Sequence, residues 1–198
     1  MRLGVYGGTF DPPHLGHLIL AAEAFEQLCL QRLLWVLTPE SPFKTGVEKA
    51  PTPARLQMLQ AAIQDYAGYE ISEIEIRRPS PQYAVDTVRL LKAENSGDEI
   101  IYLIGGDSLH DLPTWHQPQD LVAAADGFGV MRRPHDRVNL ERLENRLPGL
   151  SAKVEFVHSP LIEISGTEIR RRVQAGRSYR QFVPLAVYEL IESLGLYR

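Results

Sequence analysis

The chain has 198 residues, of which 21 are Lys or Arg and 25 are Asp or Glu, so its formal net charge is −4 with neutral histidines. This length predicts one domain over residues 1–198, and a composition of 44% hydrophobic and 23% charged residues excludes disordered, collagenous and low-complexity chains. The acidic balance argues against a nucleic-acid partner, because phosphate contacts along DNA or RNA need a basic surface.

The single cysteine, Cys29, excludes a disulfide framework and a zinc ribbon. A lone thiol fits a reducing cytosol, so we expect a cytoplasmic protein. Cys29 continues a helical apolar pattern, which predicts a side chain in the core. The first four residues do not begin a signal peptide, and no apolar run reaches the roughly 18 residues of a membrane span, so no membrane partner is expected.

Short apolar runs alternate with amphipathic helical stretches along the chain. In chain order, the apolar runs predict strands at residues 3–6, 33–37, 69–76, 100–104, 127–131 and 154–157. The helical stretches lie at residues 18–30, 54–66, 84–93, 118–125, 167–174 and 184–194. Strands that alternate with helices predict a parallel sheet with right-handed crossovers, covered on both faces. The polar stretch at residues 132–149 predicts a solvated loop and helix.

The strongest pattern is GGTFDPPHLGH, from Gly7 to His17, which follows the first predicted strand and leads into the first helix. The adjacent glycines Gly7 and Gly8 let the backbone turn sharply and approach a ligand. His14 and His17 are three residues apart and share one face of a helical first turn, and Gly16 leaves room between them. The helix start adds N–H groups and a positive dipole end. The segment therefore predicts a phosphate cradle with two imidazoles at the phosphate oxygens.

Other interpretations of this segment fit less well. It lacks the Gly-x-x-x-x-Gly-Lys pattern of a P-loop, and its glycines do not form the dinucleotide fingerprint. A metal site on Asp11, His14 and His17 is possible, but the His-Glu-x-x-His spacing of zinc proteases is missing. Packing alone does not explain two histidines beside a glycine turn at the end of a strand.

The segment from Gly8 to His17 resembles the Gly-x-Phe-x-Pro-x-His-x-Gly-His signature of nucleotidyltransferases. Its double proline and leading Gly-Gly-Thr-Phe-Asp closely resemble the bacterial nicotinate-nucleotide adenylyltransferases, also called deamido-NAD pyrophosphorylases. The resemblance implies an α/β fold, Rossmann-like and doubly wound, with a mainly parallel sheet, helices on both faces, and the helices from about residue 165 packed on the domain. It also implies that His14 and His17 are catalytic and that the ATP site includes Gly8, Thr9, Phe10, His14, Gly16 and His17.

The implied activity is adenylyl transfer from ATP to nicotinate mononucleotide in NAD biosynthesis, which gives deamido-NAD and pyrophosphate. ATP and nicotinate mononucleotide are then the partners of the enzyme. Mg²⁺ is the expected cofactor and should bind mainly through the ATP phosphates and water, with no metal ligand supplied by the protein.

A second helix start, from Ile164 to Arg170, carries hydroxyls and a guanidinium. Its Ser-x-x-Glu spacing fits an ordinary capping box, while such a helix start also binds anions and Arg170 suits a bidentate phosphate contact. The segment resembles the family's Ile-Ser-Ser-Thr-x-Ile-Arg motif for the ATP triphosphate. This implies phosphate contacts by Ser165 and Thr167 and a catalytic Arg170. Gly166 replaces the family's Ser or Ala, which should cost at most a side-chain contact.

Two further segments resemble the family's acceptor site. Residues 39–44 are similar to its Pro-Pro-His-Lys element, with Phe43 in place of the histidine and Lys44 able to meet the mononucleotide phosphate. Residues 79–87 are similar to its Ser-Tyr-Thr-x-Asp-Thr element near the nicotinate carboxylate, with Ala84 contributing its backbone N–H in place of a threonine. The implied acceptor-binding residues in these segments are Lys44, Tyr83, Ala84 and Thr87.

A second glycine turn follows the strand predicted at residues 100–104. Asp107 in this turn can accept hydrogen bonds from ribose hydroxyls or belong to the adenosine side, and Gly105 joins the ATP site. Trp115 follows; a tryptophan is usually in the core, but one after a binding turn can stack on an aromatic ring. In the nicotinate-nucleotide adenylyltransferases that this sequence resembles, a tryptophan lies at this place against the nicotinate ring. His110 and His116 are expected at the surface or in local hydrogen bonds.

Two other functions stay open from the sequence. One is a related adenylyltransferase that acts on nicotinamide mononucleotide or phosphopantetheine. The other is a nucleotide-binding module without catalysis, which would have no need for both histidines and Arg170. The sequence leaves the oligomeric state open, and a homo-oligomer is compatible with it.

Overall fold

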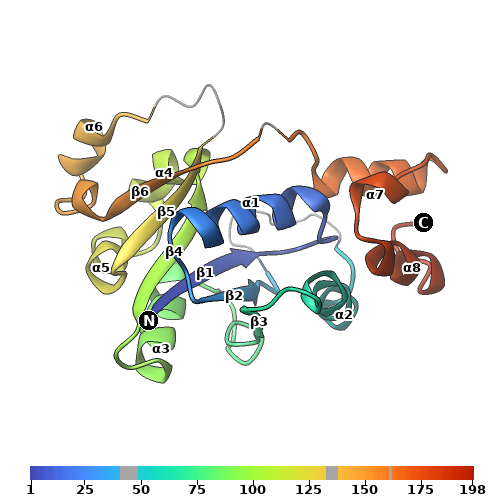
Figure 1. Cartoon of the computed structure of the whole chain (residues 1–198), viewed down its shortest axis with the longest axis horizontal. Coiled ribbons are helices and arrows are strands. Elements are labelled where there is room, and N and C mark those ends of the chain that lie inside the picture. The colour runs from blue at the N-terminus through green and yellow to red at the C-terminus, as the bar shows by residue number, and fades with distance from the viewer. Residues whose placement is uncertain (41–48, 133–137, 161) are drawn as a thin grey trace.

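The computed structural model describes residues 1–40, 49–132, 138–160 and 162–198. Six parallel strands form one sheet in the order β3-β2-β1-β4-β5-β6 (Figure 1). The strands are β1 (Arg2–Gly8), β2 (Arg32–Leu37), β3 (Tyr69–Ser72), β4 (Glu99–Gly105), β5 (Gly127–Arg132) and β6 (Val154–His158). The strand order reverses between β1 and β4, which is where open α/β sheets bind their ligands. The predicted Rossmann-like α/β fold is confirmed.

Helices connect the strands and follow the sheet. They are α1 (Leu15–Gln27), α2 (Thr52–Ile63), α3 (Ala84–Glu94), α4 (Gly106–Asp111), α5 (Pro118–Ala124), α6 (Leu140–Glu144), α7 (Gly166–Gln174) and α8 (Leu185–Ser193). Short 3-10 helices lie at Leu112–Thr114, Ser151–Lys153 and Arg180–Phe182. Within the part of the chain that the structure describes, we find no helix with the length and apolar character needed to cross a membrane.

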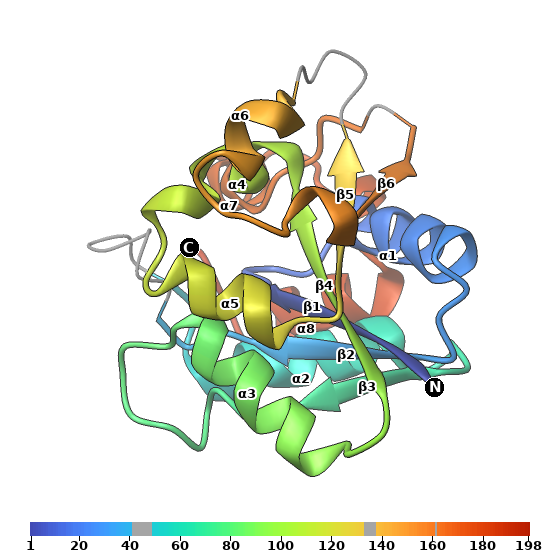
Figure 2. The same ribbon diagram turned by 90° about the vertical axis from the view of Figure 1, so that its left-hand side faces the viewer.

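Helices lie on both sides of the sheet (Figure 2), and each face of the sheet has a buried apolar cluster. Along β2 the side chains alternate: Trp35 and Leu37 join α1, α2 and α8 on one face, while Leu34 and Val36 join α3, α4 and α5 on the other. Burial on both faces explains why the strands are almost continuously apolar. Because the helices cover the two faces of the sheet, the loops meet at the carboxyl ends of β1 and β4.

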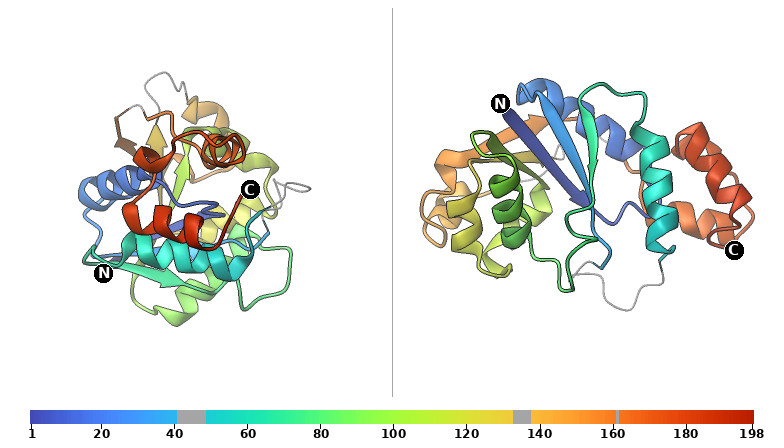
Figure 3. Two further views of the ribbon diagram at one scale, coloured as in Figure 1. Left: turned by 90° about the vertical axis from the view of Figure 1, so that its right-hand side faces the viewer. Right: turned by 90° about the horizontal axis from the view of Figure 1, so that it is seen from below.

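The last two helices lie beyond the carboxyl end of the sheet. The views in Figure 3 show α8 beside α2, and Val187 and Ile191 of α8 share a buried cluster with Met58 of α2. Ile169 of α7 belongs to the same cluster. This packing holds the start of α7 near the loop between β1 and α1.

Most of the predicted elements are present, with shifted ends. The helix predicted at residues 18–30 begins at Leu15 and ends at Gln27, and the strand predicted at residues 69–76 ends at Ser72. The prediction for Cys29 was wrong: it lies beyond the end of α1, at φ 50°, and its side chain is exposed. Helix α4 was not predicted, because six residues after a glycine turn are too few to show a helical period.

Candidate active site

The two sequence motifs meet at the carboxyl edge of the sheet. Strands β1 and β4 are neighbours and end at Gly8 and Gly105. The first motif crosses from β1 to α1, and β4 leads directly into α4. Phe10 turns the crossing segment with a left-handed φ of 44°, and its buried ring lies edge-on to His17 at 5.1 Å between centroids. The segment is therefore fixed by packing as well as by its glycines.

The imidazoles of His14 and His17 stack at the start of α1, with ring centroids 3.6 Å apart. His14 is the N-cap residue, and its backbone N–H donates to Nδ1 of His17 at 3.2 Å. Because this Nδ1 accepts, a neutral His17 ring carries its proton on Nε2 and can donate from there. A Cβ on Gly16 would lie 3.0 Å from Nδ1 of His14, so glycine leaves the room that this stack needs.

The charge of His14 is governed by its burial. The side chain is 6% exposed, and burial lowers the pKa of its imidazole to about 4. The ring is therefore neutral at pH 7 in the free protein. A phosphate beside it would favour the protonated form, so this imidazole can supply a hydrogen bond and gain charge as an anion arrives.

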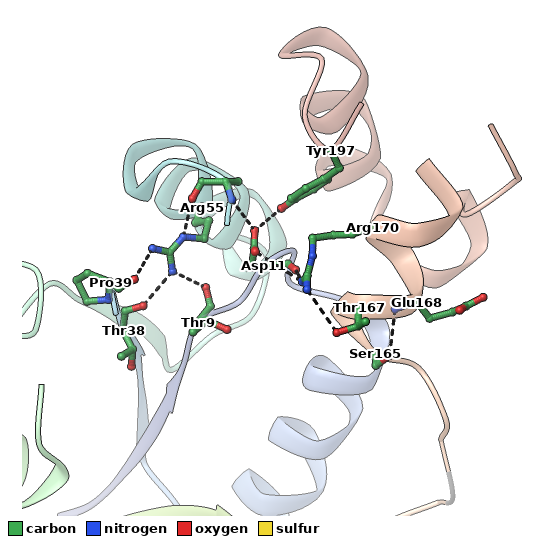
Figure 4. Close-up of polar contacts among 11 residues, drawn as sticks. Thr9, Asp11, Thr38, Pro39, Arg55, Ser165, Thr167, Glu168, Arg170 and Tyr197 are labelled. Carbon is green, nitrogen blue, oxygen red and sulfur yellow. Dashed lines mark hydrogen bonds and ion pairs between the residues drawn. The ribbon is translucent and has the colours of Figure 1, made fainter. Parts of the chain in front are cut away.

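The second motif begins α7 on the opposite side of the same hollow (Figure 4). The hydroxyl of Ser165, the N-cap residue, accepts a hydrogen bond from the N–H of Glu168 at 3.2 Å. The predicted capping box is only half formed, because the Glu168 carboxylate pairs with Arg171 and Arg172. The helix start thus has backbone N–H groups that could donate hydrogen bonds to an anion.

Arg170 lies across the gap between α7 and the first motif. Its Nη1 donates to the main-chain carbonyl of Asp11 at 2.6 Å, and its Nη2 lies 3.4 Å from the hydroxyl of Thr167. A Cβ at Gly166 would be 2.7 Å from that Asp11 carbonyl oxygen. The expectation that this glycine costs only a side-chain contact is corrected here: its missing side chain lets α7 approach the first motif.

Asp11 contacts several segments of the chain. From the sequence it was considered only as a possible metal ligand. Its Oδ1 accepts from the Tyr197 hydroxyl at 2.6 Å and from the backbone N–H of Ala50 at 3.2 Å. Its Oδ2 lies 3.6 Å from Nη1 of Arg170. Within the described residues, no group of three or more His, Cys, Asp or Glu side chains is arranged to hold a metal ion.

Arg55 is a second residue that sequence reasoning missed. It is 2% exposed, and its guanidinium donates to the carbonyls of Thr9, Thr38, Pro39 and Ala50 at 2.8–3.0 Å (Figure 4). It thereby ties the end of β1, the loop after β2 and the start of α2 together. An arginine within a helical pattern gives no sequence signal for this role, because its acceptors are backbone carbonyls.

A cavity of about 670 Å³ lies between the two motifs. Its walls include every residue that the sequence assigned to ATP: Gly8, Thr9, Phe10, His14, Gly16, His17, Gly105, Asp107, Ser165, Thr167 and Arg170. The structure thus brings together residues more than 150 positions apart in the chain.

A second cavity, of about 830 Å³, lies beside the first and is lined by Tyr83, Ala84 and Trp115. Trp115 is partly buried and stands edge-on to Tyr102, with ring centroids 6.5 Å apart. The N-cap residue of α3, Tyr83, has no side-chain capping bond. Tyr83 and Ala84 thus bring the start of α3 to this cavity, and a helix start favours a carboxylate.

The expectations for residues around this cavity have different outcomes. Thr87 is 1% exposed and is not among the residues that line the cavity, so the structure gives no support to a direct contact between its side chain and an acceptor. His116, expected at the surface or in local hydrogen bonds, is exposed; its ring stacks on Tyr83 at 3.9 Å between centroids and lines the cavity. Lys44 and Phe43 lie outside the described residues.

A buried carboxyl, Glu75, stands in the wall of the second cavity and was not found from sequence. The Thr87 hydroxyl donates to its Oε1 at 2.6 Å and accepts from Arg78 at 2.9 Å. Burial raises the pKa of Glu75, so this carboxyl takes up a proton more readily than a solvent-exposed one does. Arg78 also pairs with Asp86 in the first turn of α3 at 3.2 Å, so the cluster fixes that helix start.

Four residues line both cavities: Gly7, Gly8, Thr9 and Asp107. They lie where β1 ends and α4 begins. Two ligands that fill the two cavities would meet at this junction, with the backbone of Gly7 and Gly8 beside the meeting point.

A family model described as cytidylyltransferase-like matches residues 5–172. The probable nicotinate-nucleotide adenylyltransferase of Thermomicrobium roseum is 46% identical over 197 residues, which cover 100% of this chain and 92% of that protein. The corresponding protein of Thermus thermophilus is 41% identical over 198 residues and 100% of both chains.

Among solved structures, the nicotinic acid mononucleotide adenylyltransferase of Plasmodium falciparum complexed with APC matches 99% of this chain and 96% of its own, with a TM-score of 0.76. A structure of the same protein complexed with NaAD gives a TM-score of 0.75. At 18% identity, these two likenesses support the fold alone.

A parallel sheet with phosphate-binding turns at its switch point defines the class of nucleotide-binding α/β proteins. The chain belongs to the cytidylyltransferase-like family and, within it, to the nicotinate-nucleotide adenylyltransferases.

Proposed function

We propose that this chain transfers AMP from ATP to nicotinate mononucleotide, giving deamido-NAD and pyrophosphate in NAD biosynthesis. The observation that carries the proposal is the pair of cavities that share Gly7, Gly8, Thr9 and Asp107. ATP fills the cavity between the two motifs, and the mononucleotide fills the one beside α3. Their phosphates then meet at the junction, which is where the new phosphoanhydride bond forms.

The chemistry needs positioning and charge stabilisation more than a base. The acceptor phosphate is already an anion; one of its oxygens attacks the α-phosphorus of ATP, and pyrophosphate leaves with the electron pair of the broken bond. His14 and His17 donate to oxygens on the α-phosphate, where charge grows in the transition state. Ser165, Thr167 and Arg170 hold the β- and γ-phosphates at the start of α7.

Mg²⁺ accompanies the ATP phosphates in this proposal. It would take most of its ligands from phosphate oxygens and water. The bound ion supplies charge neutralisation to the triphosphate. The protein holds the phosphates themselves, through the two helix starts and Arg170.

Three contacts orient the acceptor: one to its carboxylate, one to the face of its pyridine ring and one to its phosphate. The first N–H groups of α3, at Tyr83 and Ala84, receive the nicotinate carboxylate, and Trp115 stacks on the ring. Lys44 meets the phosphate of the mononucleotide. Nicotinamide mononucleotide carries a neutral amide, so it gains less from the same helix start.

Pyrophosphate release with ATP and each acceptor tests the proposal. We expect kcat/KM to be highest for nicotinate mononucleotide, lower for nicotinamide mononucleotide and negligible for phosphopantetheine. Equal values for the two mononucleotides, or a preference for the amide, would overturn the acceptor assignment. A protein that binds ATP but releases no pyrophosphate with any acceptor would be a nucleotide-binding module instead. The proposed place of action is the cytoplasm, in keeping with the single cysteine.

A further inference from the structure

We infer that Tyr197, the penultimate residue, is a positioning residue that sets Arg170 for ATP through the carboxylate of Asp11. The Tyr197 hydroxyl donates to Oδ1 of Asp11 at 2.6 Å across 186 positions of sequence (Figure 4). The contact fastens the end of the chain to the first motif. The inference rests on the adenylyl transfer proposed above, because it assigns Tyr197 to the ATP side of that reaction.

The backbone adopts an unfavourable conformation to make this contact. Tyr197 has φ 65°, in the left-handed region that bulky residues avoid. Its ring turns back toward the first motif and is opposite Arg170 in Figure 4. Burial and the adjacent Asp11 carboxylate raise the pKa of the phenol far above its usual value, so Tyr197 remains a hydrogen-bond donor at working pH.

The same carboxylate stands beside Arg170. Oδ2 of Asp11 is buried without a hydrogen-bond partner and lies 3.6 Å from Nη1 of Arg170, which instead donates to the Asp11 carbonyl at 2.6 Å. With Oδ1 held by Tyr197 and by the N–H of Ala50, the carboxylate stays short of a full ion pair. This arrangement leaves the guanidinium oriented toward the cavity, where a phosphate can compete for it.

Loss of the phenol releases one of the two contacts on Oδ1. The carboxylate can then turn toward Arg170 and form the closer ion pair, which is strong in a buried setting. An arginine engaged in that way is less available to the ATP phosphates. The expected consequence is a defect that is specific for ATP and spares the acceptor.

Tyr179 offers a matched control within the same C-terminal segment. Its hydroxyl donates to Oε1 of Glu192, also at 2.6 Å. Neither Tyr179 nor Glu192 lines the ATP cavity. Replacement by phenylalanine therefore removes the same kind of hydrogen bond from the C-terminal helices without touching Asp11.

The experiment compares Tyr197→Phe with Tyr179→Phe in steady-state kinetics, ATP titration and thermal melting. We expect Tyr197→Phe to raise both the KM and the Kd for ATP about tenfold, the effect of losing one hydrogen bond between Arg170 and a charged phosphate, with an unchanged KM for nicotinate mononucleotide. Tyr179→Phe should lower the melting temperature and leave both ATP constants unchanged. ATP titrations are run at a temperature at which each variant is folded, so that a loss of stability does not imitate a loss of affinity.

A double-variant cycle tests whether Tyr197 acts through Asp11. Adding Tyr197→Phe to Asp11→Asn should weaken ATP binding by much less than it does in the native background. Native ATP affinity in Tyr197→Phe, an equal effect of Tyr179→Phe, or fully additive losses in the cycle would each overturn the inference. Failure of the proposed reaction is separable, because the wild-type chain would then release no pyrophosphate while the ATP titrations still report on Tyr197.

Discussion

His17 can use its two ring nitrogens for different partners. Nδ1 accepts the backbone N–H of His14, which directs the proton of a neutral ring to Nε2. The local role at the helix start and the proposed role at phosphate are therefore compatible. His17 can therefore contact the helix start through Nδ1 and still offer Nε2 to a phosphate.

We expect His17→Ala to lower kcat far more than it raises the KM for ATP. The donated hydrogen bond should strengthen as charge grows on the α-phosphate, and losing one preorganised donor costs roughly 10²–10³-fold in kcat. His14→Ala should be similar or milder. The exposed His110 supplies a control, since His110→Ala should leave kcat unchanged. A folded His17→Ala enzyme with near-normal kcat would contradict the assignment.

Burial of His14 gives the free protein a defined pH dependence. Its folded-state pKa, about 4, lies below the ordinary histidine pKa of 6.5, so below pH 6.5 the unfolded chain binds a proton that the native state does not. The unfolding free energy should therefore fall as pH drops from 6.5 toward 4, by about 3 kcal/mol from this group. Urea unfolding of the wild type and His14→Gln at pH 7.5, 5.5 and 4.5 measures the difference. Parallel pH profiles for the two proteins would show that this imidazole is not the cause.

We expect Trp115 to contribute to the affinity for the acceptor and not to the affinity for ATP. Trp115→Ala removes the ring that we propose stacks on the pyridine, at a cost of about 0.5–1.5 kcal/mol beyond the loss of buried area. The Kd for nicotinate mononucleotide should rise while the Kd for ATP stays nearly constant. Thermal melting beside both titrations distinguishes a binding role from a core role, since a variant that chiefly unfolds would assign Trp115 to the core.

Some contacts between elements at the site are made to the backbone. Helix α7 approaches the first motif because Gly166 has no Cβ, and Arg55 joins three segments by donating to main-chain carbonyls. Such contacts depend on where whole elements lie. A change at one of them should therefore move an element rather than remove a single bond.

Gly166→Ala should shift the start of α7 away from Asp11. The added Cβ would lie 2.7 Å from a backbone oxygen, and overpacking of this kind costs about 1–3 kcal/mol. We expect a lower melting temperature and a higher KM for ATP, with an unchanged KM for the acceptor. Gln174→Ala, at the exposed last residue of α7, is the control and should change neither. Unchanged melting and ATP kinetics in Gly166→Ala would show that α7 tolerates the methyl group.

At the scale of the whole molecule, one continuous site is built from two cavities on either side of the switch point. The product of the proposed reaction contains both nucleotides, so it should occupy both cavities at once. In equilibrium titrations we expect deamido-NAD to displace both ATP and nicotinate mononucleotide. Pyrophosphate should displace ATP alone. Simultaneous binding of deamido-NAD and nicotinate mononucleotide would contradict the shared junction at Gly7, Gly8, Thr9 and Asp107.

The sequence by itself determined the succession of the six strands and most of the helices along the chain, and it named residues that line the cavity between the two motifs. Near-continuous apolar strands, helical periods and the segment from Gly8 to His17 are local patterns, because they depend on residues a few positions apart. The sequence could not find the ends of short elements such as β3, or α4 at all, since such short segments carry too little periodicity. Cys29 was misjudged for a related reason: the apolar pattern continues past the residue where the helix ends.

Only the tertiary structure decided how distant residues share the site. Tyr197 reaches Asp11, Arg55 binds carbonyls of three segments, and Thr87 lies behind Glu75, which lines the second cavity. None of these contacts has a signal in spacing, because each depends on how the chain brings separate elements to one edge of the sheet. Hydrogen bonds and burial act over a few ångströms in space, whatever the distance along the chain, so the geometry of the site follows from the packing of the helices around the switch point.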